Sequence, residues 1–161
     1  PPNSEGEGEV TLSDLTRMAL RMDPDRVIVG EVRGAEAFPM LLAMSQGNNG
    51  SMCTMHADSA RSVFPKLAAY MSMAASGVPV ETLNLLVGSA VHLVVHLVIE
   101  RGRRMVDSVI EVTGAEGLSV VSNEVYRRGR KDHAFVTISR ESADVLSDHG
   151  FRNRKELSWS R

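Results

Sequence analysis

The sequence predicts an α/β fold in which a parallel sheet with crossover helices is followed by a β-rich C-terminal part. Two short apolar runs, Val27–Val29 and Met52–Met55, are separated by about one helix length of apolar sequence. This order is typical of a strand, a crossover helix and a second, parallel strand. From Val91 onward, β-rich segments alternate with Gly-containing turns, which indicates an antiparallel meander.

The α/β part is predicted to cover residues 1–90 and to begin with a helix. Thr11 can cap this helix, with Asp14 as its capping-box partner three residues later, and Asp23-Pro24 ends it. A buried strand follows at Arg26–Gly30. The crossover helix is expected at Ala35–Ser45, with Pro39 in its first turn, where a missing N–H is tolerated.

The second half of this part repeats the strand and helix order. A Gly-bounded turn leads into a strand at Ser51–Met55, and Asp58 or Ser59 caps a helix that runs to about Ala75. Pro65 fits this helix in two ways, because either the first turn starts late or the proline kinks the helix. Pro79 opens another helix, which ends near Gly88.

The β-rich region is predicted to cover residues 91–130 and to complete the domain, followed by a tail at 131–161. The meander strands are expected at Val91–Ile99, Met105–Val112 and Leu118–Arg127. In the tail, a short strand is expected at Phe135–Ile138 and a helix at Glu141–Asp148.

Composition limits the classes of function. The chain has 161 residues, 43% of them apolar, a net charge of −2 and one cysteine, which favours a single domain in a reducing, cytosolic compartment. Nucleic-acid binding is not expected, because only Tyr126 interleaves with the basic clusters at 101–104 and 127–131. The chain begins Pro1-Pro2 without a methionine, so we expect it to be part of a longer protein.

A candidate site follows from the two predicted parallel strands. Glu31 and His56 each come shortly after one of the two apolar runs. Ligands of such sheets bind beyond the carboxyl ends of the strands, so we expect both side chains at the same edge. An acid just past a buried strand is also how nucleotide-hydrolysing folds hold a magnesium ion or its water.

Two motifs in this region resemble a known family. Residues 20–34 read LRMDPDRVIVGEVRG and resemble the Walker B region of the secretion traffic ATPases, the hexameric motors of type II and type IV secretion and of pilus assembly. Residues 50–59 read GSMCTMHADS and resemble the His box of that family. The resemblance covers roughly Asn3 to Tyr126 and is greatest to the CpaF-like ATPases of Tad (Flp) pilus systems.

The resemblance implies the C-terminal part of a RecA-like P-loop ATPase core that uses ATP and Mg²⁺. Glu31 would hold magnesium through a water molecule or orient the attacking water, and His56 would contact the γ-phosphate region. The other residues that it implies near the nucleotide are Arg33 as a catalytic residue and Gly30, Gly34 and Thr54 as nucleotide-binding residues.

The resemblance also implies an assembly and a location. The longer protein would be a homo-hexamer on the cytoplasmic side, peripheral at the inner face of the cell membrane, with inner-membrane platform proteins as partners. Arginines often act across subunit boundaries in ring ATPases, and Arg17 and Arg21, one turn apart on the first helix, are candidates for this role.

One departure from the family pattern limits the activity of the chain itself. No Gly-x-x-x-x-Gly-Lys-Ser/Thr run occurs in the sequence, so the chain lies C-terminal to the Walker A loop and is predicted to be inactive alone. Two alternatives remain at this point. The chain could be a non-catalytic assembly module of such a complex, or it could belong to a RecA-like nucleic-acid translocase.

Overall fold

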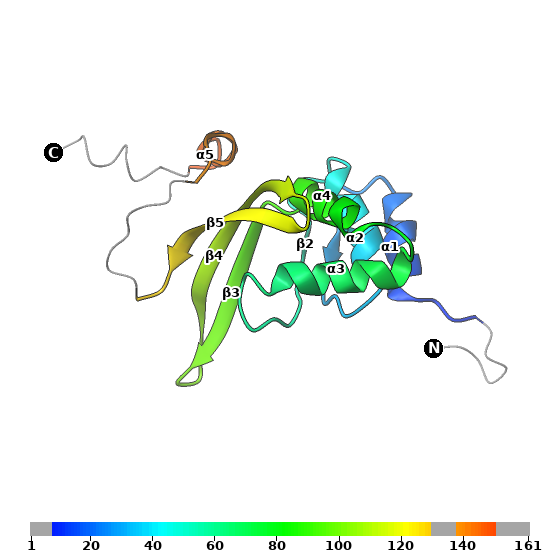
Figure 1. Cartoon of the computed structure of the whole chain (residues 1–161), viewed down its shortest axis with the longest axis horizontal. Coiled ribbons are helices and arrows are strands. Elements are labelled where there is room, and N and C mark those ends of the chain that lie inside the picture. Colours follow the sequence, from blue (N-terminus) through cyan, green and yellow to red (C-terminus); the bar gives the residue numbers. More distant parts are fainter. Residues whose placement is uncertain (1–7, 130–137, 151–161) are drawn as a thin grey trace.

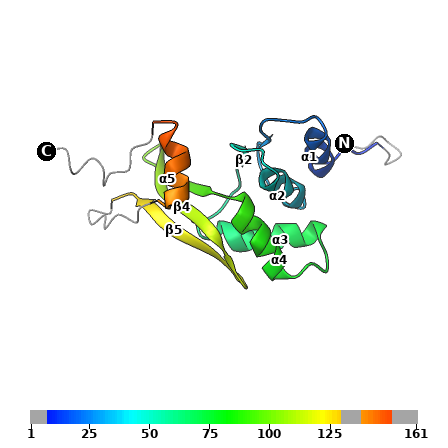
Figure 2. The same ribbon diagram turned by 90° about the horizontal axis from the view of Figure 1, so that it is seen from above.

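The computed structural model describes residues 8–129 and 138–150. Residues 12–90 form four helices and a short parallel strand pair, and a three-stranded antiparallel sheet follows at 93–127 (Figure 1). A fifth helix follows the sheet and is seen in front of β4 in the view from above (Figure 2). In the part of the chain that the structure describes, no helix is long and apolar enough to cross a membrane.

The parallel pair consists of β1 (Ile28–Val29) and β2 (Met52–Cys53), with α2 (Ala37–Ser45) as the crossover between them. The predicted strand, helix and parallel strand are therefore confirmed, and Pro39 lies in the first turn of α2 as expected. Both strands are shorter than predicted, because their hydrogen-bonded ladder covers only two residues in each.

The prediction that the first strand is buried is confirmed for one face and wrong for the other. Val27 and Val29 are buried, whereas Ile28 between them is 67% exposed. Its neighbour across the ladder, Met52, is 58% exposed. Successive side chains of a strand point to opposite faces, and the described helices cover only the face that carries the two valines.

The first helix, α1 (Leu12–Leu20), begins with the predicted capping box. The Asp14 amide donates to the Thr11 hydroxyl at 3.1 Å, and the Thr11 amide donates to the Asp14 carboxylate at 3.1 Å. Its apolar stripe is at the surface, since Leu15 is 50% and Met18 60% exposed, whereas Thr16 is buried. The stripe is therefore free to contact another part of a larger assembly.

Helix α3 (Val63–Ala74) begins later than the predicted start at Asp58 or Ser59. Hydrogen bonds between Ser59 and Ser62 hold a turn in front of it, with the Ser59 amide 2.9 Å from the Ser62 hydroxyl. Pro65 consequently falls in the first turn, so of the two alternatives for this proline the late start is confirmed.

Helix α4 (Val80–Ala90) follows Pro79, as predicted, and packs against the antiparallel sheet. A Cβ added at Gly88 would lie 2.7 Å from the carbonyl carbon of Gly114, which shows that the helix and strand backbones approach closely here. Ile110 and Val112 of the sheet belong to the same buried cluster as Leu83 and Val87 of α4. The helices and the sheet thus share one core.

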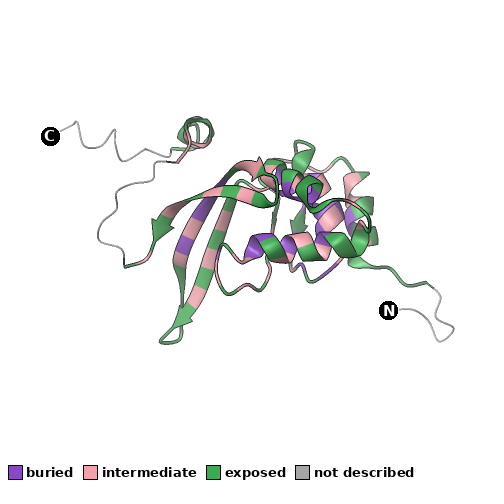
Figure 3. Cartoon of the chain, in the orientation of Figure 1, coloured by how far each residue is buried: buried purple, intermediate pink, exposed green. Residues whose placement is uncertain are grey.

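The antiparallel meander is confirmed, with strand order β3-β4-β5. Its strands are β3 (Leu93–Glu100), β4 (Arg103–Glu116) and β5 (Ser119–Arg127). Arg101 and Gly102 turn the first hairpin with positive φ angles of 49° and 76°. The end of this hairpin projects beyond the helices and is mostly exposed (Figure 3).

The fifth helix, α5 (Arg140–Ser147), confirms the predicted helix of the tail. The predicted strand at Phe135–Ile138 lies outside the described residues except for Ile138, which is not in a strand. The carboxylate of the fully buried Glu111 in β4 accepts hydrogen bonds from the Ser139 hydroxyl at 2.6 Å and from the Ser139 amide at 2.9 Å. Ser139 is the N-cap of α5, so these bonds attach the helix to the sheet.

Candidate functional site

The candidate site lies where the two parallel strands end. Glu31 follows β1 by two residues and His56 follows β2 by three. Because the strands are parallel and in register, both loops leave the same edge of the pair. The Nε2 atom of His56 is 3.1 Å from Oε1 of Glu31. The structure therefore brings together the two residues that the sequence placed at a common edge.

Arg33 binds the second carboxylate oxygen of Glu31, Oε2. Its guanidinium donates to Oε2 of Glu31 at 2.5 Å, although the Arg33 side chain is 75% exposed. This hydrogen bond is the largest cause that holds the pKa of Glu31 below its usual value, against the opposing effect of burial. Glu31 is thus a carboxylate with one neutralised oxygen.

The remaining oxygen of Glu31 has no hydrogen-bond partner. Oε1 is buried, and although His56 Nε2 lies at ion-pair distance, the two groups do not have hydrogen-bond geometry. A buried carboxylate oxygen without a partner is costly. Carboxylate oxygens are the ligands that Mg²⁺ prefers, and Mg²⁺ commonly takes only one or two of them together with phosphate oxygens and water. The donor chemistry of Oε1 therefore fits a magnesium ion or a water bound to it.

The described residues contain no cluster of side chains that could form a metal site without other ligands. Within residues 8–129 and 138–150, no three His, Cys, Asp or Glu side chains lie close enough together to hold a metal ion. Glu31 is accordingly the carboxylate that we consider for magnesium.

Hydrogen bonds between the two loops fix the position of Glu31. The Thr54 hydroxyl donates to the Gly30 carbonyl at 2.5 Å, and the Val32 amide donates to the Thr54 carbonyl at 2.8 Å. Gly30 is exposed, and a Cβ added to it would meet no atom of the chain within 4 Å. Gly34, in contrast, is buried, and its amide donates to the Glu36 carboxylate at 3.0 Å. Of the two glycines, only Gly30 therefore has a backbone that a bound molecule could approach directly.

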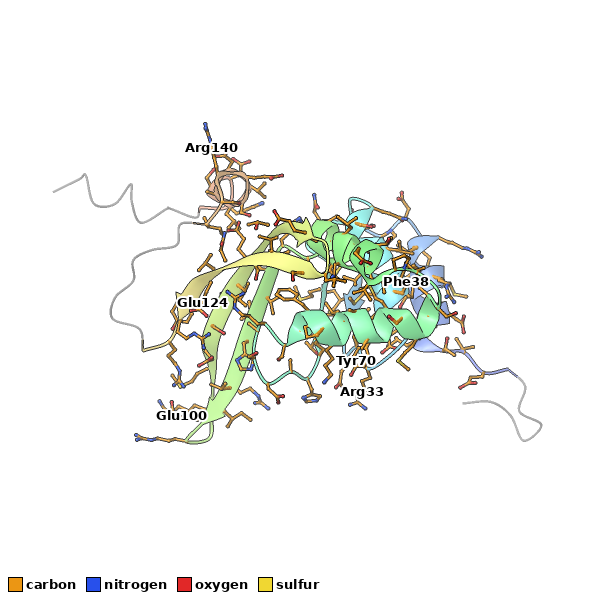
Figure 4. All side chains as sticks on the ribbon, in the orientation of Figure 1. Arg33, Phe38, Tyr70, Glu100, Glu124 and Arg140 are labelled. Carbon is orange, nitrogen blue, oxygen red and sulfur yellow. The ribbon has the colours of Figure 1, made fainter. Side chains whose placement is uncertain are left out.

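Sequence reasoning missed Lys66, which lies in α3. Its ammonium donates to the backbone carbonyl of His56 at 2.6 Å and lies 5.9 Å from the centre of the Tyr70 ring. Arg33 and Tyr70 lie near each other below α3 (Figure 4). Lys66 is separated from His56 by ten residues, and its only sequence signal is a charge within an apolar helix. Lys66 also lines a hollow of about 280 Å³, together with His56, Ala57, Asp58 and Ser62.

Of the two arginines predicted for subunit contacts, Arg17 lies on α1 and Arg21 is the residue that caps its C-terminal end. Both are exposed, and Arg17 is 3.5 Å from Asp14 on the same helix. No hydrogen bond or ion pair among the described residues joins either Arg17 or Arg21 to Glu31 or His56.

Comparison with known proteins relates the chain to secretion systems. The family model described as "Type II/IV secretion system protein" matches residues 3–156. A Mycobacterium tuberculosis protein named "Putative conjugal transfer protein" is 39% identical over 116 residues, which are 71% of this chain and 32% of that protein. The type IV secretion system protein PtlH of Bordetella pertussis is 33% identical over 120 residues, or 73% of this chain and 35% of PtlH.

A solved structure is similar as well. The crystal structure of the VirB11 ATPase from the Brucella suis type IV secretion system, in complex with sulphate, aligns with a TM-score of 0.58 and 31% sequence identity. The alignment covers 62% of this chain and 31% of that one. The chain thus spans about a third of the length of the relatives that it matches. Because the family model covers nearly all of the sequence, the chain belongs to the type II/IV secretion system protein family.

Proposed function

We propose that the chain is the C-terminal part of an ATPase that powers type II/IV secretion or Tad (Flp) pilus assembly. The observation that carries this proposal is the pair formed by Glu31 and His56, whose side chains are 3.1 Å apart where the parallel strands end. Membership of the secretion family and the similarity to a protein titled VirB11 ATPase support it. The residues at 20–34 and 50–59 resemble those of the CpaF-like ATPases, which favours a pilus system.

In this proposal Glu31 acts through the oxygen that has no hydrogen-bond partner. Oε1 would hold the hydration shell of magnesium or orient the attacking water, while Arg33 keeps the carboxylate ionised. When bound, magnesium would supply Lewis-acid stabilisation of the phosphate charge. Glu31 is thereby placed to act most strongly as charge develops in the transition state.

The surrounding residues would position the nucleotide. His56 is 89% exposed at its side chain, so its imidazole is free to contact the γ-phosphate region. Arg33 is also exposed and can add positive charge near the transferred phosphoryl group. Gly30 would allow the nucleotide to approach the backbone, and Thr54 holds the Gly30 carbonyl in place. Gly34 is buried, so it would contribute to nucleotide binding through the conformation of its loop and not by direct contact.

The assembly that we propose is a homo-hexamer at the cytoplasmic face of the inner membrane, with membrane platform proteins as partners. The exposed apolar stripe of α1 and the two arginines beside it, Arg17 and Arg21, provide a surface for a neighbouring subunit. The phosphate loop would come from the preceding part of the longer protein, since this chain has none.

The test is a pair of substitutions in the longer protein. Glu31→Gln removes the charge and keeps the shape, so we expect kcat for ATP hydrolysis to fall about 100-fold or more while ATP binding is largely retained. His56→Ala should lower kcat by about 10-fold to 100-fold, as expected for one positioned hydrogen-bonding group. Steady-state kinetics and nucleotide-binding measurements distinguish these effects.

A matched control separates catalysis from folding. Glu81→Gln makes the same change at an exposed carboxylate in the first turn of α4, and it should leave kcat near the wild-type value. Circular dichroism would check that each variant is folded. Near wild-type turnover by a folded Glu31→Gln variant would contradict the mechanism and favour a non-catalytic assembly module.

A further inference from the structure

The imidazole of His56 needs a restraint that its own loop does not provide. Its side chain is largely exposed, and its contact with Glu31 lacks hydrogen-bond geometry. Among the described residues, the segment from Met55 to Asp58 makes no backbone–backbone hydrogen bond. A side chain at this position would therefore sample several orientations unless another element held the backbone of its loop.

Helix α3 supplies such a restraint through Lys66. The ammonium of Lys66 donates to the carbonyl oxygen of His56 at 2.6 Å, a short charge-assisted bond to the residue itself. The same ammonium lies 5.9 Å from the Tyr70 ring centre, at a distance that allows a cation–π interaction.

The face of α3 that carries Lys66 also lies near the loop after β1, which contains Glu31, Arg33 and Gly34. Tyr70, one turn after Lys66, lies near Arg33, whose guanidinium binds Glu31 (Figure 4). Met73 follows on this face, and its terminal carbon would be 3.9 Å from a Cβ added at Gly34. Positions 66, 70 and 73 of one helix thus lie along both loops that carry the candidate catalytic residues.

We propose that Lys66 is a positioning residue for His56: its bond to the His56 carbonyl fixes the loop so that the imidazole faces Oε1 of Glu31. Lys66 acts through His56 and not on the substrate, because its ammonium is directed to a backbone carbonyl. This inference rests on the proposed ATPase function and deepens it by adding a residue from a different element.

The kinetic test uses substitutions of Lys66 in the longer protein. Lys66→Met keeps the length of the side chain but removes the charge and the donor, and should lower kcat about 10-fold while KM for ATP changes less than about twofold. Lys66→Arg retains a charged donor and should recover most of the loss. Arg61→Met removes a cation from the preceding turn, where Arg61 contacts Ser122 and not His56, and should leave kcat unchanged.

A double-mutant cycle shows whether Lys66 acts through His56. If it does, adding Lys66→Met to a His56→Ala variant should produce no further loss of kcat. A purely structural role would instead make the two losses multiply, and this result would overturn the proposal. So would wild-type kcat in a folded Lys66→Met variant.

A spectroscopic test on the 161-residue chain needs no ATP hydrolysis. Glu31→Gln should shift the NMR signals of the His56 ring nitrogens in the otherwise wild-type chain, because the two side chains are 3.1 Å apart. The same substitution should cause little shift when Lys66→Met is also present. A shift that persists in full would overturn the proposal, whereas a longer protein without ATPase activity would contradict only the proposed function.

Discussion

At the scale of single residues, Glu31 has two oxygens with different environments. Oε2 receives a 2.5 Å hydrogen bond from Arg33, and Oε1 is buried beside His56 without a hydrogen bond. The pairing with Arg33 keeps the group ionised at neutral pH and leaves the second oxygen available. One oxygen of this carboxylate is therefore held in place, while the other remains without a hydrogen-bond partner.

The charge state of Glu31 provides the first prediction. Because the Arg33 hydrogen bond is the largest cause of its lowered pKa, Arg33→Gln should raise the pKa of Glu31 toward its usual value. NMR titration of the side-chain carboxyl carbon in the 161-residue chain measures this shift. Arg17→Gln removes an arginine that pairs with Asp14, and it should leave the Glu31 titration unchanged. An unchanged titration in the Arg33 variant would refute the assignment.

The sequence predicted Glu31 and His56 as neighbours because parallel strands fix where their loops leave the sheet. It did not reveal Lys66, since a contact between a side chain in one helix and a backbone carbonyl ten residues earlier depends on how the intervening turn folds. Here the Ser59–Ser62 turn delays α3 and directs Lys66 back toward His56. Such a turn has no periodic pattern that sequence reasoning can use.

At the scale of elements, the sequence predicted the type of every described helix and strand but not all of their limits. The strands β1 and β2 are two residues long because their ladder is short, whereas the apolar runs extend further on both sides. The exposed Ile28 could not be distinguished from buried valines by composition. Burial depends on which neighbours cover a strand, and a short apolar run has no period that reports this.

The crossing of α4 and β4 provides a second prediction. Gly88→Ala should gain about 1 kcal/mol from helix propensity, but its Cβ would lie 2.7 Å from the backbone carbon of Gly114. Overpacking of this kind costs about 1–3 kcal/mol, and a backbone atom cannot rotate away as a side chain can. We therefore expect a net decrease in the free energy of unfolding, measured by urea denaturation. Ser89→Ala, at the exposed next position, should change it by less than about 0.5 kcal/mol.

The attachment of α5 provides a prediction about pH. Burial raises the pKa of Glu111, whereas hydrogen bonds from Ser139 and Ser142 lower it. Together the hydrogen bonds have the larger effect, so the pKa lies below its usual value of 4.5. A group with a lowered pKa in the folded state stabilises that state above its usual pKa, and the effect is lost as pH falls through the folded value. We expect α5 to leave the sheet below pH 4.5, which the NMR signal of the Ser139 amide would report.

A substitution separates this effect from general acid unfolding. In Glu111→Gln the charge is absent at every pH, so the Ser139 signal should not change over the pH range in which the wild-type signal changes. If both proteins showed the same transition, other carboxylates would be responsible and the assignment to Glu111 would be wrong. Ser139→Ala removes the N-cap and should weaken the attachment at every pH, with a cost of about 1 kcal/mol.

At the scale of the whole molecule, the chain exposes apolar surface that a larger assembly could cover. Ile28 and Met52 lie side by side on the open face of the parallel pair, and Leu15 and Met18 lie along α1. The matched residues make up only about a third of the length of the relatives. In the proposed function, the phosphate loop comes from the preceding part of the longer protein and not from this chain.

Because the phosphate loop would lie outside this chain, we can predict how the chain alone binds and hydrolyses ATP. Without a phosphate loop it lacks the backbone N–H groups and the lysine that hold the β- and γ-phosphates. The purified 161-residue chain should therefore show no ATP turnover and at most weak nucleotide binding, as measured by isothermal titration calorimetry. Micromolar affinity for ATP–Mg would mean that the chain contains a nucleotide site other than the one proposed here.

The close approach of Gly88 to Gly114 has a mechanical consequence for the whole molecule. Two backbones in direct contact leave no layer of side chains that could slide or repack, so α4 cannot roll over the sheet without first moving away from it. Helix α3 packs on α4 and holds the His56 carbonyl through Lys66. The His56 loop is thus connected to the antiparallel sheet through α3 and α4, two elements that pack directly on one another.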